Sequence, residues 1–346
     1  MRDDLLIIIL PSLASVILSA WLTRFLCHPA APFQILDHPN ERSLHERPTP
    51  RGGGLAILIA FLVCGAAVSL FYPPRGLAEI TLGILVVSIV SFLDDRHSVP
   101  PIYRFLAHGI AAAVILYGGF SLQKLEIPGV TWHWSHVAGS LFSAVFIVWM
   151  INLYNFMDGM DGFAGGMAVS GFGTFAILGW MAGHDAFMAI NLVIAAAAAG
   201  FLIFNFPPAR IFMGDIGSST LGLMAAMLSL WGARDGIFPF WIALLVFSPF
   251  IADSTITLVQ RLLRREKIWR AHKTHFYQQL VQAGWGHRRT VLLEYIIMAG
   301  CGITALWAAR ATAAMQVTIS VGWALFYFVF FFWVSRLATH DTKTGT

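Results

Sequence analysis

The sequence predicts an all-α, polytopic integral membrane protein with about 10 or 11 transmembrane helices. Charged residues make up only 12% of the 346 residues and hydrophobic residues make up 58%, whereas a soluble domain carries about twice that share of charge. The mean hydropathy is +0.72. Apolar runs long enough to cross a bilayer recur from one end of the chain to the other. Together these observations indicate a bundle of membrane-spanning helices.

The predicted spans follow the apolar runs in order. There are eleven such runs, at residues 5–27, 52–72, 77–93, 105–119, 137–154, 163–181, 186–204, 217–232, 236–257, 292–310 and 314–335. Several are short or interrupted by glycine, so the expected number is ten or eleven. The first run is preceded by two aspartates and has no small-residue cleavage site, and we therefore expect it to remain as a span and not to act as a signal peptide.

The rest of the composition indicates a single domain over residues 1–346. The chain contains no long charged tail, low-complexity segment or clear internal repeat. Its three cysteines, Cys27, Cys64 and Cys301, lie in or beside apolar runs and show no pairing spacing. Neither a disulfide framework nor a zinc cluster is therefore expected.

Lysine and arginine residues are distributed unevenly between the segments that join the predicted spans. With eleven spans, these segments alternate between the two sides of the membrane, and one side collects 17 of the 22 basic residues. Because loops rich in basic residues stay in the cytoplasm, the amino terminus is predicted to lie outside and the carboxyl terminus inside. The pI near 9.1 follows from this asymmetry, and no nucleic-acid partner is expected.

The most informative segment is Asn152–Gly162, NLYNFMDGMDG, which directly follows the apolar run 137–154. It contains Asn152, Asn155, Asp158 and Asp161. Carboxylates at a membrane surface are costly to bury unless they are paired or bind a cation, and two acids three residues apart would share a helical face. Oxygen ligands of this kind suit Mg²⁺. A cation held at the membrane surface in turn suggests phosphate chemistry.

Two further motifs lie at predicted cytoplasmic span ends, and each has an alternative interpretation. Arg51 precedes three glycines whose main-chain amides would be able to approach an anion, although the same glycines would serve a flexible turn. Asp94 and Asp95 end the third run. This acid pair would bind a cation or act as a base, or would simply cap a helix beside a neutralising arginine.

Two more motifs complete this predicted face. Asp215 lies between two glycines at the start of a span and is a candidate metal ligand, while Phe212 would stack on a base or pack at the interface. His272 and His275 would share a face if their segment were helical. They lie in the basic segment 260–290, which would hold a diphosphate or meet anionic lipid.

Taken together, these motifs resemble the polyprenyl-phosphate N-acetylhexosamine-1-phosphate transferases, that is, glycosyltransferase family 4, which is related to phospho-N-acetylmuramoyl-pentapeptide transferase. The resemblance covers residues 37–290, in the family's order. It rests on five motifs: PTPRGG at 48–53, Asp94–Asp95, the Asn152–Gly162 segment, FMGDIGS at 212–218 and HKTH at 272–275. The spacing of the histidines is closer to the O-antigen-initiating branch than to the pentapeptide transferases.

The resemblance implies an enzyme of the cell inner (cytoplasmic) membrane, with its active site on the cytoplasmic face. It would transfer N-acetylhexosamine-1-phosphate from UDP-GlcNAc or a 6-deoxy UDP-sugar to undecaprenyl phosphate and release UMP, as the initiating step of O-antigen or other envelope polysaccharide synthesis. It would use Mg²⁺, with Mn²⁺ as a substitute. A homodimer is compatible with the resemblance.

The resemblance also implies roles for individual residues. Asp215, Asn155 and Asp158 would hold the metal. Asp94 would ready the lipid phosphate, with Asp95 and Asp158 as further catalytic residues. The substrate-binding residues would be Arg51, Asn152, Asp161, Asn205, Phe212, His272 and His275, with Asn205 and Phe212 on uracil and the histidines on the diphosphate or sugar.

A transporter or flippase of lipid-linked or anionic substrates is the alternative from a different class, because intramembrane acids and broken helices also mark ion pathways. The position of the acids favours the transferase. Transporter acids lie near the middle of a span, whereas these lie at cytoplasmic span ends beside glycines.

Overall fold

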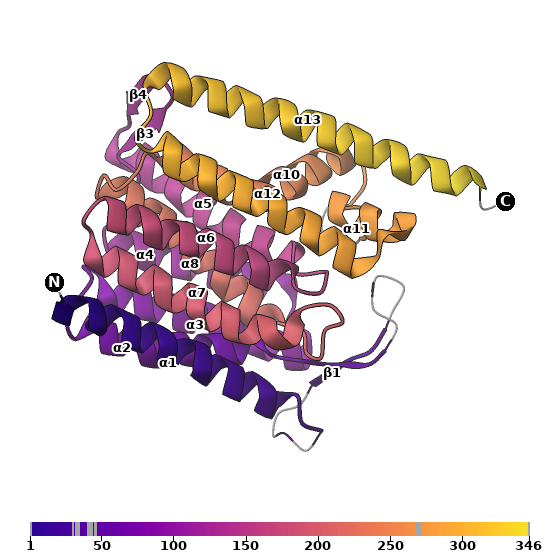
Figure 1. The fold of residues 1–346 in the computed structure, drawn as a ribbon, viewed down its shortest axis with the longest axis horizontal. Helices are drawn as coiled ribbons and strands as arrows, with labels where there is room; N and C mark the ends of the chain where they lie inside the picture. The colour runs from indigo at the N-terminus through magenta and orange to yellow at the C-terminus, as the bar shows by residue number, and fades with distance from the viewer. Residues whose placement is uncertain are drawn as a thin grey trace.

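The computed structural model describes residues 2–29, 31, 35–39, 44, 47–267 and 272–344, with side chains omitted at 2–5 and 338–344. Its helices are α1 (Arg2–Leu26), α2 (Gly54–Ser69), α3 (Leu77–His97), α4 (Pro101–Tyr117), α5 (His136–Phe156), α6 (Phe163–Met181), α7 (Asp185–Asn205), α8 (Asp215–Arg234), α9 (Phe240–Val246), α10 (Ser248–Leu263), α11 (Phe276–Leu280), a π-helical turn (Val281–Trp285), α12 (Gly286–Ala308) and α13 (Ala313–Thr344). The helices run roughly along the long axis (Figure 1).

The predicted all-α membrane architecture is confirmed. Among the described residues, eight helices are long and apolar enough to cross a membrane, or nine if α9 and α10 form one broken span. The shorter apolar helices α2 and α4 coincide with two more of the predicted runs. Each of the eleven predicted runs therefore corresponds to helical structure, but full span length is reached by fewer than the 10 or 11 expected.

The predicted run 236–257 is not a straight helix. It divides into α9 and α10, which meet at 81°. Pro249 lies in the first turn of α10, where its missing N–H group and its ring prevent α9 from continuing. The break turns α10 away from the direction of the bundle, and this places Asp253 of α10 beside the segment that contains the histidine motif.

Helix α8 forms the centre of the bundle, and its most apolar window is entirely buried. It packs against α2, α3 and α5. Small residues allow this close approach: a Cβ atom on Gly222 would lie 2.6 Å from the Met150 carbonyl oxygen of α5, and one on Gly54 of α2 would lie 2.2 Å from the Gly217 Cα atom. The amino-terminal end of α8 is thereby fixed against the elements that carry the other motifs.

Two antiparallel hairpins lie at opposite ends of the bundle (Figure 1). Strands β1 (Ile35–Asp37) and β2 (Thr49–Arg51) pair with Ile35 opposite Arg51. Strands β3 (Lys124–Ile127) and β4 (Val130–His133) pair with Lys124 opposite His133. The β1–β2 hairpin and α11 lie at the end where the polar motifs gather, and the carboxyl terminus lies at this end while the amino terminus lies at the other.

Candidate active site

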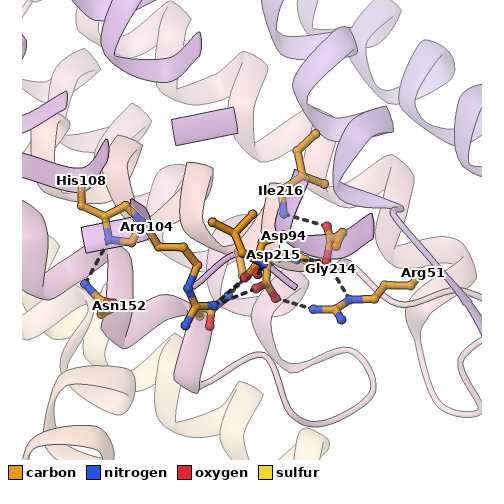
Figure 2. Close-up of polar contacts among 12 residues, drawn as sticks. Arg51, Asp94, Arg104, His108, Asn152, Gly214, Asp215 and Ile216 are labelled. Atoms are coloured by element: carbon orange, nitrogen blue, oxygen red, sulfur yellow. Dashed lines mark hydrogen bonds and ion pairs between the residues drawn. The ribbon is translucent and has the colours of Figure 1, made fainter. Parts of the chain in front are cut away.

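Asp215, the first residue of α8, is the acid on which the other groups converge. The Arg51 guanidinium contacts its Oδ1 atom, and Arg104 Nη1 lies 3.4 Å from its Oδ2 atom. The two arginines approach from opposite sides (Figure 2). A carboxylate held between two guanidinium groups remains ionised at the membrane surface, and this charge is what a cation site requires.

Asp95 holds the amino-terminal end of α8 from the neighbouring helix α3. Its Oδ1 atom accepts from the Asp215 N–H at 2.9 Å, and its Oδ2 atom accepts from the Ile216 N–H at 3.1 Å. Its side chain is 1% exposed and pairs with Arg51 Nε at 2.9 Å. Two amides that helix geometry leaves unpaired are therefore satisfied by a residue from another element, and Asp215 is fixed relative to α3.

Asp94 faces the same cluster from the last turn of α3. Its Oδ2 atom accepts from Arg104 Nη1 at 2.5 Å, and its Oδ1 atom accepts from the Val99 N–H at 2.7 Å. Because the same Arg104 nitrogen also lies near Asp215, one guanidinium joins the two acids. The structure thus brings the Asp94–Asp95 pair to Asp215, as the sequence predicts.

The backbone around Asp215 leaves no room for larger side chains. Gly214 has φ +77°, and a Cβ atom there would lie 2.8 Å from Asp95 Oδ2. The N–H groups of Gly52 and Gly53 both donate to the Phe212 carbonyl, and that of Gly54 donates to the Met213 carbonyl. The suggestion that these amides face an anion is therefore wrong, because they join the β2 loop to the segment before α8.

Arg51 provides a positive charge beside the acids of this cluster. Burial lowers the pKa of the Arg51 guanidinium, but the adjacent Asp215 and Asp95 carboxylates more than offset this and raise that pKa overall. Arg51 is therefore a permanent cation beside the acids. Its placement at the end of β2 is maintained by a bridge to Phe212, which explains why the PTPRGG and FMGDIGS motifs belong to one site.

Asn155 and Asp158 lie next to the cluster. Asn155 Nδ2 donates to Ser218 Oγ at 3.0 Å, one turn into α8, and its side chain also reaches Asp215. Among the described residues, the Asp158 carboxylate has no hydrogen-bond or ion-pair partner. Burial raises the pKa of Asp158, with Arg51 opposing and Asp215 reinforcing the shift. An unpartnered carboxylate of this kind favours a cation beside it.

Asp161 does not share a helical face with Asp158, contrary to the sequence-based expectation. Helix α5 ends at Phe156, and both acids lie in the following loop, where Gly162 has φ +74°. Asp161 Oδ2 accepts from the Ala209 N–H at 3.0 Å, and its Oδ1 atom lies 3.1 Å from His287 Nδ1. Asp161 therefore joins the α5–α6 and α7–α8 loops, while Asp158 remains near Asp215.

Asn205 and Asn152 have well-defined internal partners. Asn205 is 4% exposed; its Oδ1 atom accepts from the Gly162 N–H at 2.9 Å and its Nδ2 atom donates to the Ile211 carbonyl at 2.9 Å. Asn152 Nδ2 donates to the Val148 carbonyl at 2.7 Å and lies 3.3 Å from His108 Nδ1, away from the acids (Figure 2). Their predicted contacts with substrate remain predictions.

The histidine motif is held by an acid that the sequence analysis missed. His272 and His275 precede α11 and are not helical, so the helical-face hypothesis is wrong, but their ring centroids lie 4.9 Å apart. Asp253 Oδ1 lies 3.0 Å from His275 Nδ1, and Asp253 also accepts from the Phe276 and Tyr277 N–H groups. Asp253 lies inside a predicted span and outside the five motifs, although a carboxylate at such a position is itself a signal of function.

His272 is the more exposed histidine of the pair. Burial, together with the neighbouring His275 and Arg261 side chains, lowers the pKa of His272 to about 4. Its ring is therefore neutral near pH 7 and offers one donor and one acceptor. Arg270, which belongs to the same predicted basic segment, and Arg42 of the first loop lie outside the described residues.

Several known proteins are similar in sequence to this chain. The model of glycosyl transferase family 4 matches residues 77–233. A probable undecaprenyl-phosphate N-acetylglucosaminyl 1-phosphate transferase from Bacillus subtilis (strain 168) is 30% identical over 325 residues, which cover 92% of this chain and 90% of the relative. The chain belongs to glycosyl transferase family 4.

Other relatives place the protein within family 4. A decaprenyl-phosphate N-acetylglucosaminephosphotransferase from Mycobacterium leprae (strain TN) is 30% identical, over 89% of this chain and 86% of the relative. A phospho-N-acetylmuramoyl-pentapeptide-transferase from Shouchella clausii (strain KSM-K16) is 28% identical, over 85% of this chain and 93% of the relative. The predicted membership of the polyprenyl-phosphate N-acetylhexosamine-1-phosphate transferases is confirmed. The protein is thus a multi-pass membrane transferase, and the transporter alternative is not supported.

Asp95→Ala is expected to destabilise the fold as well as the site. The change removes the acceptor for two amides of α8 and the ion-pair partner of Arg51, so a loss of about 3 kcal/mol is expected. Thermal unfolding in detergent, followed by circular dichroism, measures it. Glu126→Ala is the control, because its partner Lys124 lies in the exposed hairpin; an unfolding midpoint as high as that of this control would contradict the capping role.

Proposed function

We propose that this protein transfers N-acetylhexosamine-1-phosphate from a UDP-sugar to a polyprenyl phosphate, undecaprenyl phosphate in the first instance, and releases UMP. An oxygen of the acceptor phosphate attacks the sugar-bearing phosphorus of the donor. The bond from that phosphorus to the oxygen bridging the two donor phosphates breaks, the bridging oxygen leaves with UMP, and a lipid diphosphosugar forms. The observation that carries the proposal is the convergence of Asp94, Asp158 and Asp215 with two arginines at one end of a membrane bundle.

The residues at this end fit a divalent cation. No group of three or more His, Cys, Asp or Glu side chains is arranged as a metal site among the described residues. However, the donor set of Asp215, Asp158 and Asn155 consists of the hard oxygens that Mg²⁺ prefers, and within the part of the chain that the structure describes the Asp158 carboxylate has no hydrogen-bond or ion-pair partner. Mg²⁺, or Mn²⁺ in its place, would neutralise charge on the transferring phosphate.

The remaining groups support substrate binding. Arg51 and Arg104 provide guanidinium groups suited to phosphate oxygens. Asp161 and Asn205 join the segments that follow α5 and α7, and these segments, together with Phe212, would form the nucleotide pocket. His272 and His275 would contact the diphosphate or sugar. Asp94, which is joined to Asp215 through Arg104, would position the acceptor phosphate.

The site is proposed to face the cytoplasm at the inner membrane, because UDP-sugars are cytoplasmic anions and the basic residues predict that side. The Bacillus and Mycobacterium relatives are named as N-acetylglucosamine phosphate transferases, which supports N-acetylglucosamine as the sugar. A 6-deoxy-N-acetylhexosamine is the second candidate, on the spacing of His272 and His275. An O-antigen or related envelope polysaccharide pathway and a homodimer are further predictions.

A donor panel tests the proposed function directly. Purified protein is incubated with undecaprenyl phosphate, Mg²⁺ and either UDP-GlcNAc, a UDP-6-deoxy-N-acetylhexosamine, UDP-MurNAc-pentapeptide or UDP-glucose. Chromatography separates UMP from UDP, and mass spectrometry identifies the lipid product. UMP with a lipid diphosphosugar is expected, with loss on EDTA addition and recovery on adding Mg²⁺ or Mn²⁺. Release of UDP would mean simple glycosyl transfer, and no release from any donor would contradict the proposal.

The predicted orientation has its own test. Single cysteines at Ser98, Ala209 and Gly284, introduced into a cysteine-free background, are expected to react only with reagents that reach the cytoplasm. A cysteine at Gly129, in the turn between β3 and β4, is expected to react from outside. The basic-residue asymmetry gives this direction. Labelling of Gly284 from outside would contradict a cytoplasmic active site.

A further inference from the structure

His287 lies in the first turn of α12 and connects three separate segments. Its Nδ1 atom is 3.1 Å from Asp161 Oδ1, in the α5–α6 loop. Its Nε2 atom is 3.3 Å from the Leu44 carbonyl oxygen, in the segment between β1 and β2. Asp161 in turn accepts from the Ala209 N–H of the α7–α8 loop. One half-buried imidazole is therefore positioned to hold three loops at the site end of the bundle.

The partners of His287 determine its charge. A carboxylate oxygen and a carbonyl oxygen can only accept hydrogen bonds, so both ring nitrogens must carry hydrogen to satisfy them. The Asp161 N–H also approaches Nδ1, at 3.4 Å, but a longer contact of this kind is weaker than a charge-assisted bond to the carboxylate. His287 is thus best described as an imidazolium paired with Asp161.

A second residue of α12 holds the same loop. The Tyr295 hydroxyl donates to the Gly162 carbonyl at 2.7 Å, and the Gly162 N–H donates to Asn205 Oδ1. The loop after α5 is therefore fixed to α12 at two neighbouring positions, Asp161 and Gly162. Through the same two positions it is fixed to the segment that leads to α8, which includes Phe212.

We propose that His287 is a positioning residue for the donor pocket. It keeps Asp161, and with it the α5–α6 and α7–α8 loops that Asp161 joins, in the arrangement that binds the nucleotide. The inference rests on the proposed function, because it assigns the donor to these loops. His287 does not contact the carboxylate of Asp94 or of Asp215. Its loss should therefore weaken donor binding and leave the chemical step nearly unchanged.

Kinetics of UMP release with varied UDP-GlcNAc, or whichever donor of the panel is most active, test this. His287→Ala is expected to raise the donor KM about tenfold or more while kcat changes less than about threefold and the acceptor KM is unchanged. Tyr295→Phe, which removes only the hydroxyl, should raise the donor KM by a smaller factor. His136→Ala is the matched control, since His136 is exposed at the opposite end of α5.

Two conservative variants separate the contacts of His287. Asparagine retains an amide donor near the Nδ1 position and so keeps the bond to Asp161, whereas glutamine retains one near Nε2 and keeps the bond to Leu44. His287→Asn should therefore have a donor KM closer to that of the wild type than His287→Gln. This comparison holds even if His287→Ala does not fold.

The outcomes distinguish the inference from the proposed function. A donor KM unchanged in His287→Ala, a loss confined to kcat, or a His287→Gln variant that performs as well as His287→Asn would overturn the positioning role in an active enzyme. A wild-type protein that releases no UMP from any donor would instead overturn the proposed function. Direct titration of UDP onto wild type and His287→Asn provides a measure of binding that does not depend on turnover.

Discussion

Asp215→Asn is expected to reduce kcat/KM for UMP release at least about a thousandfold, because the amide cannot supply the charge that holds a divalent cation on the transferring phosphate. In the structure this carboxylate lies between Arg51 and Arg104 and next to Asn155. The same change should also weaken Mg²⁺ binding. Turnover with varied Mg²⁺ and calorimetric titration of Mg²⁺ onto the protein measure the two effects.

Asp235→Asn is the matched control for this substitution. Asp235 follows the last residue of α8 and pairs with Arg234, His184 and the Trp231 indole N–H, at the opposite end of the helix from Asp215. An aspartate-to-asparagine change at that end should leave turnover and Mg²⁺ dependence as in the wild type. If folded Asp215→Asn protein turned over at a near-normal rate, Asp215 would not be a metal ligand.

The helical membrane fold could be predicted from sequence because hydropathy reports directly on burial in lipid. Each predicted run coincides with helical structure. Hydropathy does not report the direction in which a helix runs. The run 236–257 is continuous in composition, yet Pro249 begins a new helix at 81° to α9. Asp253 lies in α10, beyond that bend, and contacts His275, whereas a straight-span interpretation places Asp253 inside the membrane-spanning bundle.

The membership of the site was easier to predict than its contacts. Asp94 and Asp95 form an acid pair at the end of an apolar run and Asp215 lies between two glycines, and the structure brings all three together. The ion-pair partners of acidic residues at the site are harder to predict, because an ion pair between residues more than a hundred positions apart leaves no local pattern in the sequence. Arg104 and His287 act through such distant pairs, and neither lies within one of the five motifs.

The loop after α5 shows why spacing alone is insufficient. Three-residue spacing predicts a shared helical face only while the helix continues. Here α5 ends at Phe156, and a glycine with positive φ at Gly162 turns the chain. Asp158 and Asp161 therefore lie in different surroundings: Asp158 is near Asp215, whereas Asp161 pairs with His287. The glycines of the motif were the available signal for this turn.

Asp94→Asn is expected to reduce kcat about a hundredfold while UDP-sugar binds with unchanged affinity, because only the step that involves the acceptor phosphate is affected. The loss should be smaller than that of Asp215→Asn. The second ionisation of a phosphate monoester lies near pH 6, so much of the acceptor is already a dianion at neutral pH and needs positioning more than deprotonation. The bond from Arg104 to Asp94 provides a structural route for such positioning.

His275→Ala is the informative comparison, because His275 is held by Asp253 in the donor half of the proposed site. Its loss should weaken donor binding and turnover together, whereas Asp94→Asn should affect turnover alone. Calorimetric titration of UDP-sugar onto each variant, combined with single-turnover rates, separates the two patterns. If Asp94→Asn lost donor affinity while His275→Ala retained it, Asp94 would belong to the donor site and His275 to the acceptor site, and the proposed division of roles would have to be reversed.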